Sequence, residues 1–330
     1  MVVTGWQMAA TSISNQLADQ FLQHAVDLAR FEAHEQQRIL RLLKKLERDL
    51  VKDLASADPT APTRTAFQQG RLEALLEQTR RTINGAYRQI ATSHQSEMRD
   101  LADFEAEQIS NAVNGSVGAS VMSVAVPETQ LAAIASDVLI QGAPSRDWWK
   151  RQAGGVQQKF ENAMRQGVLR GETNDDLVRR VRGTKAKGYS DGIVAGIAAK
   201  NAKALVRSSV QAVANKARED LYEANDDVLR GVQVLSTLDG RTTPICIARS
   251  NAAWDPTTGK PLPESPRQEP YPGAPPYHFQ CRSILLPVLK PLDDLLEGTG
   301  PRKSGQLGKL PAGQQASMDG QVAGDLKYED

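Results

Sequence analysis

Two long stretches of helical periodicity constrain the fold of this 330-residue chain more than any other feature. From Ser14 to Ala55, and again from Leu72 to Ala112, inward positions recur every three or four residues, which places them on one face of an α-helix. Each stretch therefore predicts a long amphipathic helix. The inward positions are Leu17, Phe21, His24, Leu28, Phe31, Ile39, Leu42, Leu46, Leu50 and Leu54 in the first, and Leu72, Leu76, Thr79, Ile83, Tyr87, Ile90, His94, Met98, Leu101, Glu105, Gln108 and Ala112 in the second.

Both stretches run into residues that stop helices. Pro59 follows Asp58, and proline lacks a backbone donor and disfavours the helical conformation of the residue before it. Asn114 and Gly115 favour a C-cap at the end of the second stretch. Because a short turn joins them, we expect two antiparallel helices in a hairpin over residues 1–114. A free-standing coiled-coil adaptor is one function that such a hairpin could serve.

Residues 115–230 predict a helical segment built from shorter elements. Thr173 can cap a helix, and Asp175 and Asp176 then lie in its first turn, where carboxylates are favourable. The last element is Ala-rich and long. The predicted helices span Pro127–Ile140, 146–169, Thr173–Val181 and Ser190–Glu223.

Charge is distributed unevenly along the chain, although the net charge is only +1. Residues 146–218 carry 16 Lys and Arg against 6 Asp and Glu, an excess of ten positive charges between two acidic segments. Such an excess predicts a surface for phosphate or for an acidic partner. The alternative is a set of solvated helix faces that acidic neighbours balance in the fold. The candidate DNA or acidic-partner residues are Lys200, Lys203, Arg207, Lys216 and Arg218.

The pattern changes at Gly231. Residues 232–236 and 283–288 are β-prone, and we expect these two strands to pair. The proline-rich stretch between them predicts a long loop. The fold class is therefore mainly α, with a small α+β domain over residues 231–296. Residues 297–330 contain too few apolar side chains to offset ordering entropy and predict a flexible tail.

Both cysteines of the chain belong to one candidate site in this small domain. Cys246 follows Asp239 closely, and His278 precedes Cys281 by three residues, which lets two side chains reach one point. Zinc prefers four ligands of these types, so Asp239, Cys246, His278 and Cys281 are candidate zinc ligands. A disulfide between the two cysteines is a second possibility, although cytoplasmic synthesis disfavours it. Two buried thiols beside a hydrogen-bonded histidine are a third.

The same four residues also allow an enzymatic interpretation. A cysteine with His278 could form a nucleophile and base oriented by Asp239, giving a hydrolase or transferase, or a metal could serve a nuclease. No nucleophile-elbow motif or phosphate-binding loop accompanies them. We therefore expect no catalytic residues at this site. We expect a structural knot instead, in which Arg282 binds Asp239 and Thr242 or Thr243 caps a helix that carries Cys246. The knot comprises Asp239, Arg241, Thr242, Cys246, His278, Cys281 and Arg282.

The sequence predicts no membrane partner. It holds no uninterrupted apolar run of about 18 residues, the length of a spanning helix. Its first residues lack the basic region and the apolar core of a secretory signal. We therefore expect a protein made in the cytoplasm.

The order Ser236-Thr-Leu-Asp239-Gly-Arg241-Thr242, Cys246, a proline-rich loop and His278-x-x-Cys281-Arg282 resembles the C-terminal domain of tailed-phage minor head proteins of the Mu F-type head morphogenesis family. The resemblance covers about residues 150–290. The typical family ending is His-Pro-x-Cys-Arg-Cys, and here Phe279 replaces the proline and Ser283 the last cysteine.

The resemblance implies a structural component of the virion. It implies a low-copy protein inside the capsid at the portal vertex, acting in head morphogenesis and in DNA packaging or ejection. The implied partners are the portal protein, the major capsid protein or scaffold, and packaged double-stranded DNA. Contacts of the basic segment with DNA phosphates would be independent of sequence and sensitive to salt.

Overall fold

The computed structural model describes residues 5–60, 65–124 and 126–297. Residues Met1–Lys290 form one compact unit and Pro291–Asp330 form a second. In the second unit the described element is the short helix α8, Leu292–Glu297. The predicted tail lies outside the described residues beyond Glu297.

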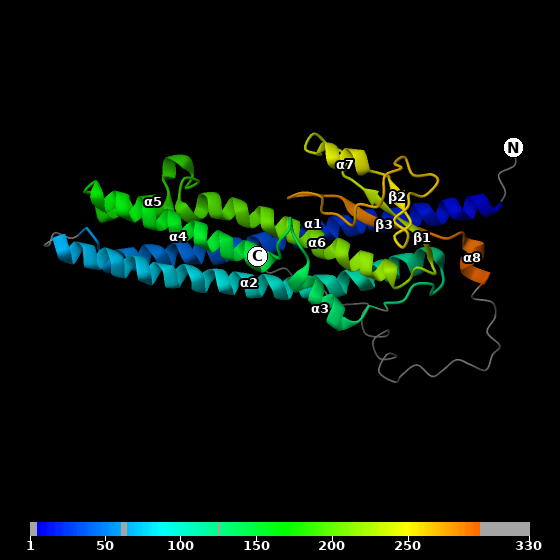
Figure 1. The fold of residues 1–330 in the computed structure, drawn as a ribbon, viewed down its shortest axis with the longest axis horizontal. Helices are drawn as coiled ribbons and strands as arrows, with labels where there is room; N and C mark the ends of the chain where they lie inside the picture. Colours follow the sequence, from blue (N-terminus) through cyan, green and yellow to red (C-terminus); the bar gives the residue numbers. More distant parts are fainter. Residues whose placement is uncertain (1–4, 61–64, 125, 298–330) are drawn as a thin grey trace. The chain divides into compact units, whose positions relative to one another are not determined.

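Helices α1 (Gly5–Ala57) and α2 (Thr65–Val117) form the predicted antiparallel pair. Figure 1 shows them side by side, with α1 in blue and α2 in cyan. The inward stripe of α2 is buried from Leu72 to Glu105, as its periodicity predicts. The pair therefore buries its apolar faces against each other and against the later helices.

The end of α2 differs from the prediction. Gly115 remains inside the helix, and Gly118, with φ of +75°, takes the left-handed conformation just beyond it. The Asn114 side chain instead accepts hydrogen bonds from the backbone N–H groups of Val121 and Met122. Asn114 therefore holds the segment after the helix, and the stop signal lies three residues later than expected.

Three helices follow, α3 (Glu128–Asp137), α4 (Ser145–Leu169) and α5 (Asn174–Arg182), close to their predicted bounds. Thr173 caps α5 in a capping box, in which its hydroxyl accepts from the Asp176 backbone N–H and the Asp176 carboxylate accepts from the Thr173 N–H. This local pattern is readable in sequence because all of its partners lie within four residues.

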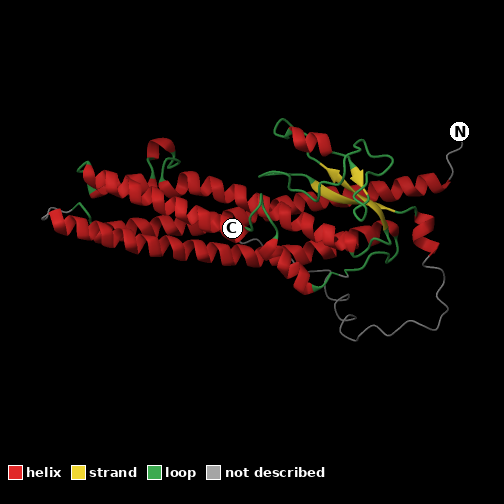
Figure 2. Cartoon of the chain, in the orientation of Figure 1, coloured by secondary structure: helices red, strands yellow, loops and turns green. Residues whose placement is uncertain are grey.

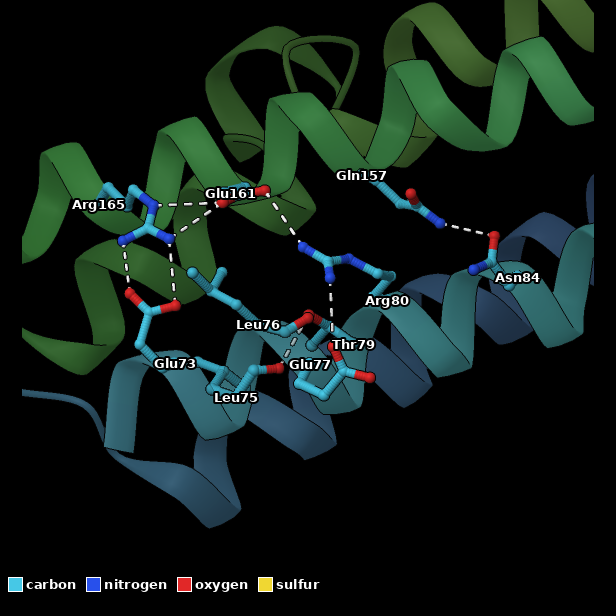
Figure 3. Close-up of polar contacts among 10 residues, drawn as sticks. All are labelled: Glu73, Leu75, Leu76, Glu77, Thr79, Arg80, Asn84, Gln157, Glu161 and Arg165. Carbon is cyan, nitrogen blue, oxygen red and sulfur yellow. Dashed lines mark hydrogen bonds and ion pairs between the residues drawn. The ribbon is translucent and has the colours of Figure 1, made fainter. Parts of the chain in front are cut away.

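Helix α4 packs along α2 through polar as well as apolar side chains. Arg165 places both terminal nitrogens on Glu73 of α2, at 2.7 and 3.2 Å, and also binds Glu161 on its own helix (Figure 3). About two helical turns before Arg165 on the facing surface, Gln157 donates to the side chain of Asn84. These contacts are mostly exposed, so they align the two helices more than they stabilise them.

The long helix predicted from Ser190 begins later. Helix α6 spans Ala199–Glu223, and a short π-helical segment, Ile193–Ala198, precedes it. Before that segment the chain makes a tight loop in which a Cβ added to Gly192 would lie 2.5 Å from the Arg182 carbonyl oxygen. The loop therefore depends on backbone contacts that helical periodicity does not reveal.

The sheet lies near the end of the first unit, and Figure 2 shows its strands in yellow. Strands β1 (Leu229–Leu235) and β3 (Ile284–Leu289) pair antiparallel, which confirms the predicted pairing. A two-residue strand, β2 (Ala253–Trp254), adds to the other edge of β1, giving the order β2-β1-β3. Helix α7 (Pro244–Arg249) lies between β1 and β2 in the chain.

The sheet is joined to the helices through α6. Asn215 of α6 accepts from the Leu285 backbone N–H at 2.9 Å and donates to the Ser283 carbonyl, so its amide pairs with β3 as a neighbouring strand would. Tyr222 of α6 donates to the Leu285 carbonyl. The segments 1–114, 115–230 and 231–296 thus share one hydrophobic core up to Lys290. Among the described residues, no helix is long and apolar enough to span a membrane.

Candidate functional site

Helix α7, the loop before β3 and the β1–β3 strand pair bring the residues of the candidate site together. Cys246 lies on α7, whose first residue is Pro244 and whose N-cap position is Thr243. His278 and Cys281 belong to the loop that leads into β3. Because β1 and β3 are paired, the segments that follow β1 and precede β3 meet at the same end of the sheet.

The ligand atoms of Cys246, His278 and Cys281 lie within 4.8 Å of one another. The Sγ atom of Cys246 is 3.1 Å from Nε2 of His278 and 3.7 Å from Sγ of Cys281. Both thiols are free, and the cysteines expose 3% and 0% of their surface. We refer to these three residues as the Cys–His–Cys cluster.

The orientation of His278 is set by both ring nitrogens. Nδ1 lies 2.8 Å from the carbonyl oxygen of Phe279, which can only accept, so the ring proton belongs on Nδ1. The lone pair of Nε2 then points to Cys246 and to the Thr243 hydroxyl, 2.9 Å away. The ring is therefore held as the tautomer that offers Nε2 as an acceptor or as a metal ligand.

Serine hydroxyls complete the surroundings of the sulfurs. Ser236, just after β1, donates to the Cys246 carbonyl at 3.0 Å and lies 2.9 Å from the hydroxyl of Ser283. The Ser283 side chain in turn lies beside both sulfurs. The sequence placed Ser236 only in the family-like motif, predicted Thr243 only as a possible helix cap and marked Ser283 only as a departure from that motif. Thr243 does occupy the N-cap position, but its hydroxyl makes no capping hydrogen bond and faces His278 instead.

The two thiols differ in acidity. Burial raises the pKa of Cys281 and outweighs the hydrogen bonds from the side chain and backbone of Ser283. Burial also acts on Cys246, but its contacts with the side chains of Ser283, Thr243 and His278 outweigh it and lower its pKa. Cys246 is therefore the sulfur with the greater thiolate character.

Asp239 does not join the Cys–His–Cys cluster. Its carboxylate accepts two hydrogen bonds from Arg282, at 2.6 and 2.7 Å, and one from the backbone N–H of Arg241. The Arg282 guanidinium, followed by the Arg241 amide, holds the pKa of Asp239 well below its usual range. The predicted fork of Arg282 onto Asp239 is present, and the Thr242 hydroxyl closes the same turn by donating to the Thr237 carbonyl.

The candidate DNA-binding residues of α6 have different surroundings. Lys200 and Lys203 are exposed, whereas Arg207 binds Glu32 of α1 at 2.7 Å. Lys216 is half-buried and pairs with two carboxylates of its own helix. Arg218 is buried, so it cannot reach a phosphate in this conformation.

Arg218 belongs to a buried ionic cluster among the long helices, and Glu35 belongs to another. In the Glu105 cluster, Glu105 accepts from Arg218 at 3.0 Å and lies 2.7 Å from Nε2 of His24. In the Glu35 cluster, Glu35 binds Arg38 at 2.6 Å and lies 2.7 Å from Nδ1 of His94. Sequence periodicity placed His24, His94 and Glu105 on inward faces but did not reveal these partners.

Comparison of the chain with protein-family models, with curated proteins and with solved structures finds no match.

Proposed function

We propose that this chain is a minor head protein of a tailed phage, present in low copy inside the capsid at the portal vertex. The observation that carries the proposal is the convergence of the residues that resemble the Mu F-type motif. Asp239 binds Arg282 across 43 positions, and Cys246 lies beside His278 and Cys281. These residues surround the end of the β1–β3 pair, so they act together as the structural knot of the small domain.

The long helices supply the surface for protein partners. Leu22 and Val26, one turn apart on α1, expose 60% and 46% of their surface. Exposed apolar side chains grouped in this way favour protein contact. In this proposal the hairpin binds the portal protein, with the major capsid protein or scaffold as further partners, and acts in head morphogenesis and in DNA packaging or ejection.

The exposed lysines of α6 supply the contact with packaged DNA. Lys200 and Lys203 lie three residues apart, so they share one face of the helix, and both are exposed. Lysine ammonium groups bind phosphate without reading sequence, which suits a protein that meets a whole genome.

An enzymatic role for the Cys–His–Cys cluster has weaker support. A cysteine nucleophile must meet its substrate, and Cys246 and Cys281 expose 3% and 0% of their surface. The Thr243 hydroxyl and a second sulfur also occupy the space around Nε2 of His278 and the Cys246 thiol.

The proposal is tested with the phage whose genome encodes the chain. Mass spectrometry of purified virions should detect the chain at far fewer copies than the major capsid protein, and the co-expressed portal protein should retain it during purification. Leu22→Glu with Val26→Glu should reduce portal retention about tenfold or more, because carboxylates in an apolar contact lose their hydration.

Leu139→Glu is the matched control, since Leu139 exposes 61% of its surface on a different segment, between α3 and α4. Portal retention should survive this substitution. Absence of the chain from virions that contain the capsid and portal proteins would contradict the proposal.

A further inference from the structure

We propose that Cys246, His278 and Cys281 bind one zinc ion, with Ser283 beside the fourth coordination position. This inference does not depend on the proposed virion role. The three ligand atoms already converge within 4.8 Å. Zinc takes thiolates and imidazoles as ligands and is usually four-coordinate and tetrahedral in structural sites.

The spacing of the two sulfurs fits a shared metal. Two thiolates at about 2.3 Å from a tetrahedral zinc lie about 3.8 Å apart. The observed separation of Cys246 Sγ and Cys281 Sγ is 3.7 Å, whereas bonded sulfurs of a disulfide lie about 2.0 Å apart. The cysteine backbones are therefore placed so that the sulfurs need little movement to bind one ion.

The histidine is oriented for the same ion. Zinc-bound histidines usually donate their other ring N–H to a backbone carbonyl or a carboxylate, which orients the ring. His278 does so through Nδ1 and the Phe279 carbonyl at 2.8 Å, and directs Nε2 toward the sulfurs. The 3.1 Å between Nε2 and Cys246 Sγ is about half an ångström shorter than a tetrahedral N–S edge, so the ring moves away from Cys246 on binding while Nε2 stays within the 4.8 Å that spans the three ligand atoms.

The environment of the sulfurs suits thiolate ligands. The Ser283 side chain lies beside both sulfurs, and the two cysteines are almost fully buried. Ligand type also selects the metal. Two thiolates and one imidazole favour zinc over magnesium or calcium, which prefer oxygen ligands.

Asp239 is excluded from this ligand set, unlike in the sequence-based hypothesis. Both of its oxygens are occupied by Arg282, and it does not lie with the three convergent ligand atoms. The fourth position therefore falls to an exogenous ligand such as water, in reach of the Ser283 hydroxyl. A site with three protein ligands and one exchangeable ligand is an established zinc arrangement.

Zinc would connect two segments that the sequence separates. Cys246 on α7 and Cys281 before β3 are 35 residues apart, and the proline-rich loop lies between them. A metal that binds both closes this loop and stabilises the folded domain over the unfolded chain.

The test uses the full chain, reduced and purified without oxygen, stripped with a chelator and titrated with Zn²⁺ alone. Elemental analysis should find one zinc per chain, and Co²⁺ in its place should show the absorption of a tetrahedral site with thiolate ligands. His278→Ala and Cys246→Ser should each lower zinc affinity more than about 100-fold, which is the upper range for loss of an outer-shell partner.

Three further variants keep the test informative if a ligand variant misfolds. Ser283→Cys should raise zinc affinity about tenfold or more, because a thiolate replaces an exchangeable ligand. Ser110→Cys is its matched control, since it adds a buried thiol on α2 outside the cluster and should leave the affinity unchanged. Asp239→Asn should also retain zinc.

Three results would overturn the proposal. The first is a folded wild-type chain that binds no Zn²⁺ while both thiols titrate as free. The second is a disulfide between Cys246 and Cys281 in the chain isolated from cells. The third is loss of zinc in Asp239→Asn, which would return the carboxylate to the ligand set.

Discussion

The histidines among the long helices and the histidine beside the sheet use their ring nitrogens differently. His24 and His94 each place one nitrogen on a buried carboxylate, and an arginine binds the same carboxylate. His278 instead gives one nitrogen to a backbone carbonyl and faces a thiol and a hydroxyl with the other. Histidine therefore takes part in buried ion pairs among the long helices, whereas beside the sheet it is one of three potential metal ligands.

The difference shows whether the protein itself supplies the positive charge that each cluster requires. In the Glu105 cluster the guanidinium of Arg218 compensates the carboxylate within the protein, which is the condition for burying charge. In the Cys–His–Cys cluster the facing atoms are sulfurs and an imidazole lone pair, which a metal cation can share. Three predictions test this contrast.

The largest effect is expected from Arg218→Met. The side chains of Arg218 and Glu105 are 1% and 0% exposed, so the variant leaves a buried carboxylate without its cation. Its free energy of unfolding should fall by about 3–5 kcal/mol, measured by chemical denaturation. The double variant that adds Glu105→Leu should recover part of this loss. The control is Arg81→Met, whose side chain is 75% exposed and whose free energy of unfolding should change little. A loss below about 1 kcal/mol for Arg218→Met would show that the cluster does not behave as a coupled unit.

The second-largest effect is expected from acid, which should weaken the two ionic clusters. Burial raises the pKa of Glu105 and Glu35, but Arg218 with His24, and His94 with Arg38, outweigh it and hold both pKa values below the ordinary 4.5. A carboxyl group with a lowered folded-state pKa stabilises the fold above its unfolded pKa, and this contribution disappears as pH falls through the folded value. The denaturation midpoint should therefore decline below about pH 4.5.

A matched variant isolates the contribution of one carboxylate to this decline. Glu105→Gln should be less stable than the wild type at pH 7 and should lose less stability on acidification, since it has no carboxylate to protonate there. Equal acid sensitivity of the variant and the wild type would assign the decline to other groups.

The smallest effect is expected from Cys281→Ala in the metal-free chain. Cys281 is fully buried but small, and its loss leaves no uncompensated charge, so unfolding should become easier by only about 1 kcal/mol. Chemical denaturation in the presence of a chelator measures this. A cost as large as that of Arg218→Met would mean that the Cys–His–Cys cluster stabilises the fold without metal, and the contrast between the two regions would fail.

Much of the fold could be predicted because its signals are local. The stripe from Leu72 to Glu105, the cap at Thr173 and the alternation that pairs β1 with β3 depend on residues close in sequence or on a repeated spacing. The late start of α6 and the short strand β2 could not be predicted, since both depend on backbone contacts with distant segments.

The candidate site was predicted in part for the same reason. The spacing of His278 and Cys281, and the charges of Asp239 and Arg282, are visible in sequence, and the structure brings each pair together. Ser283 entered the site only through the register of β3, which turns its hydroxyl toward Ser236 and the sulfurs. A single serine carries no sequence signal for such a position.

The sequence by itself determined which faces of the helices turn inward, including those of His24, His94 and Glu105, because helical periodicity is an intrinsic property of the chain. Tertiary structure decided what those faces meet. It paired Arg218 with Glu105 across 113 positions, which removed one arginine from the basic surface, and it separated Asp239 from the two thiols. Burial and pairing of charge depend on distances between elements, and those distances exist only after the elements have packed.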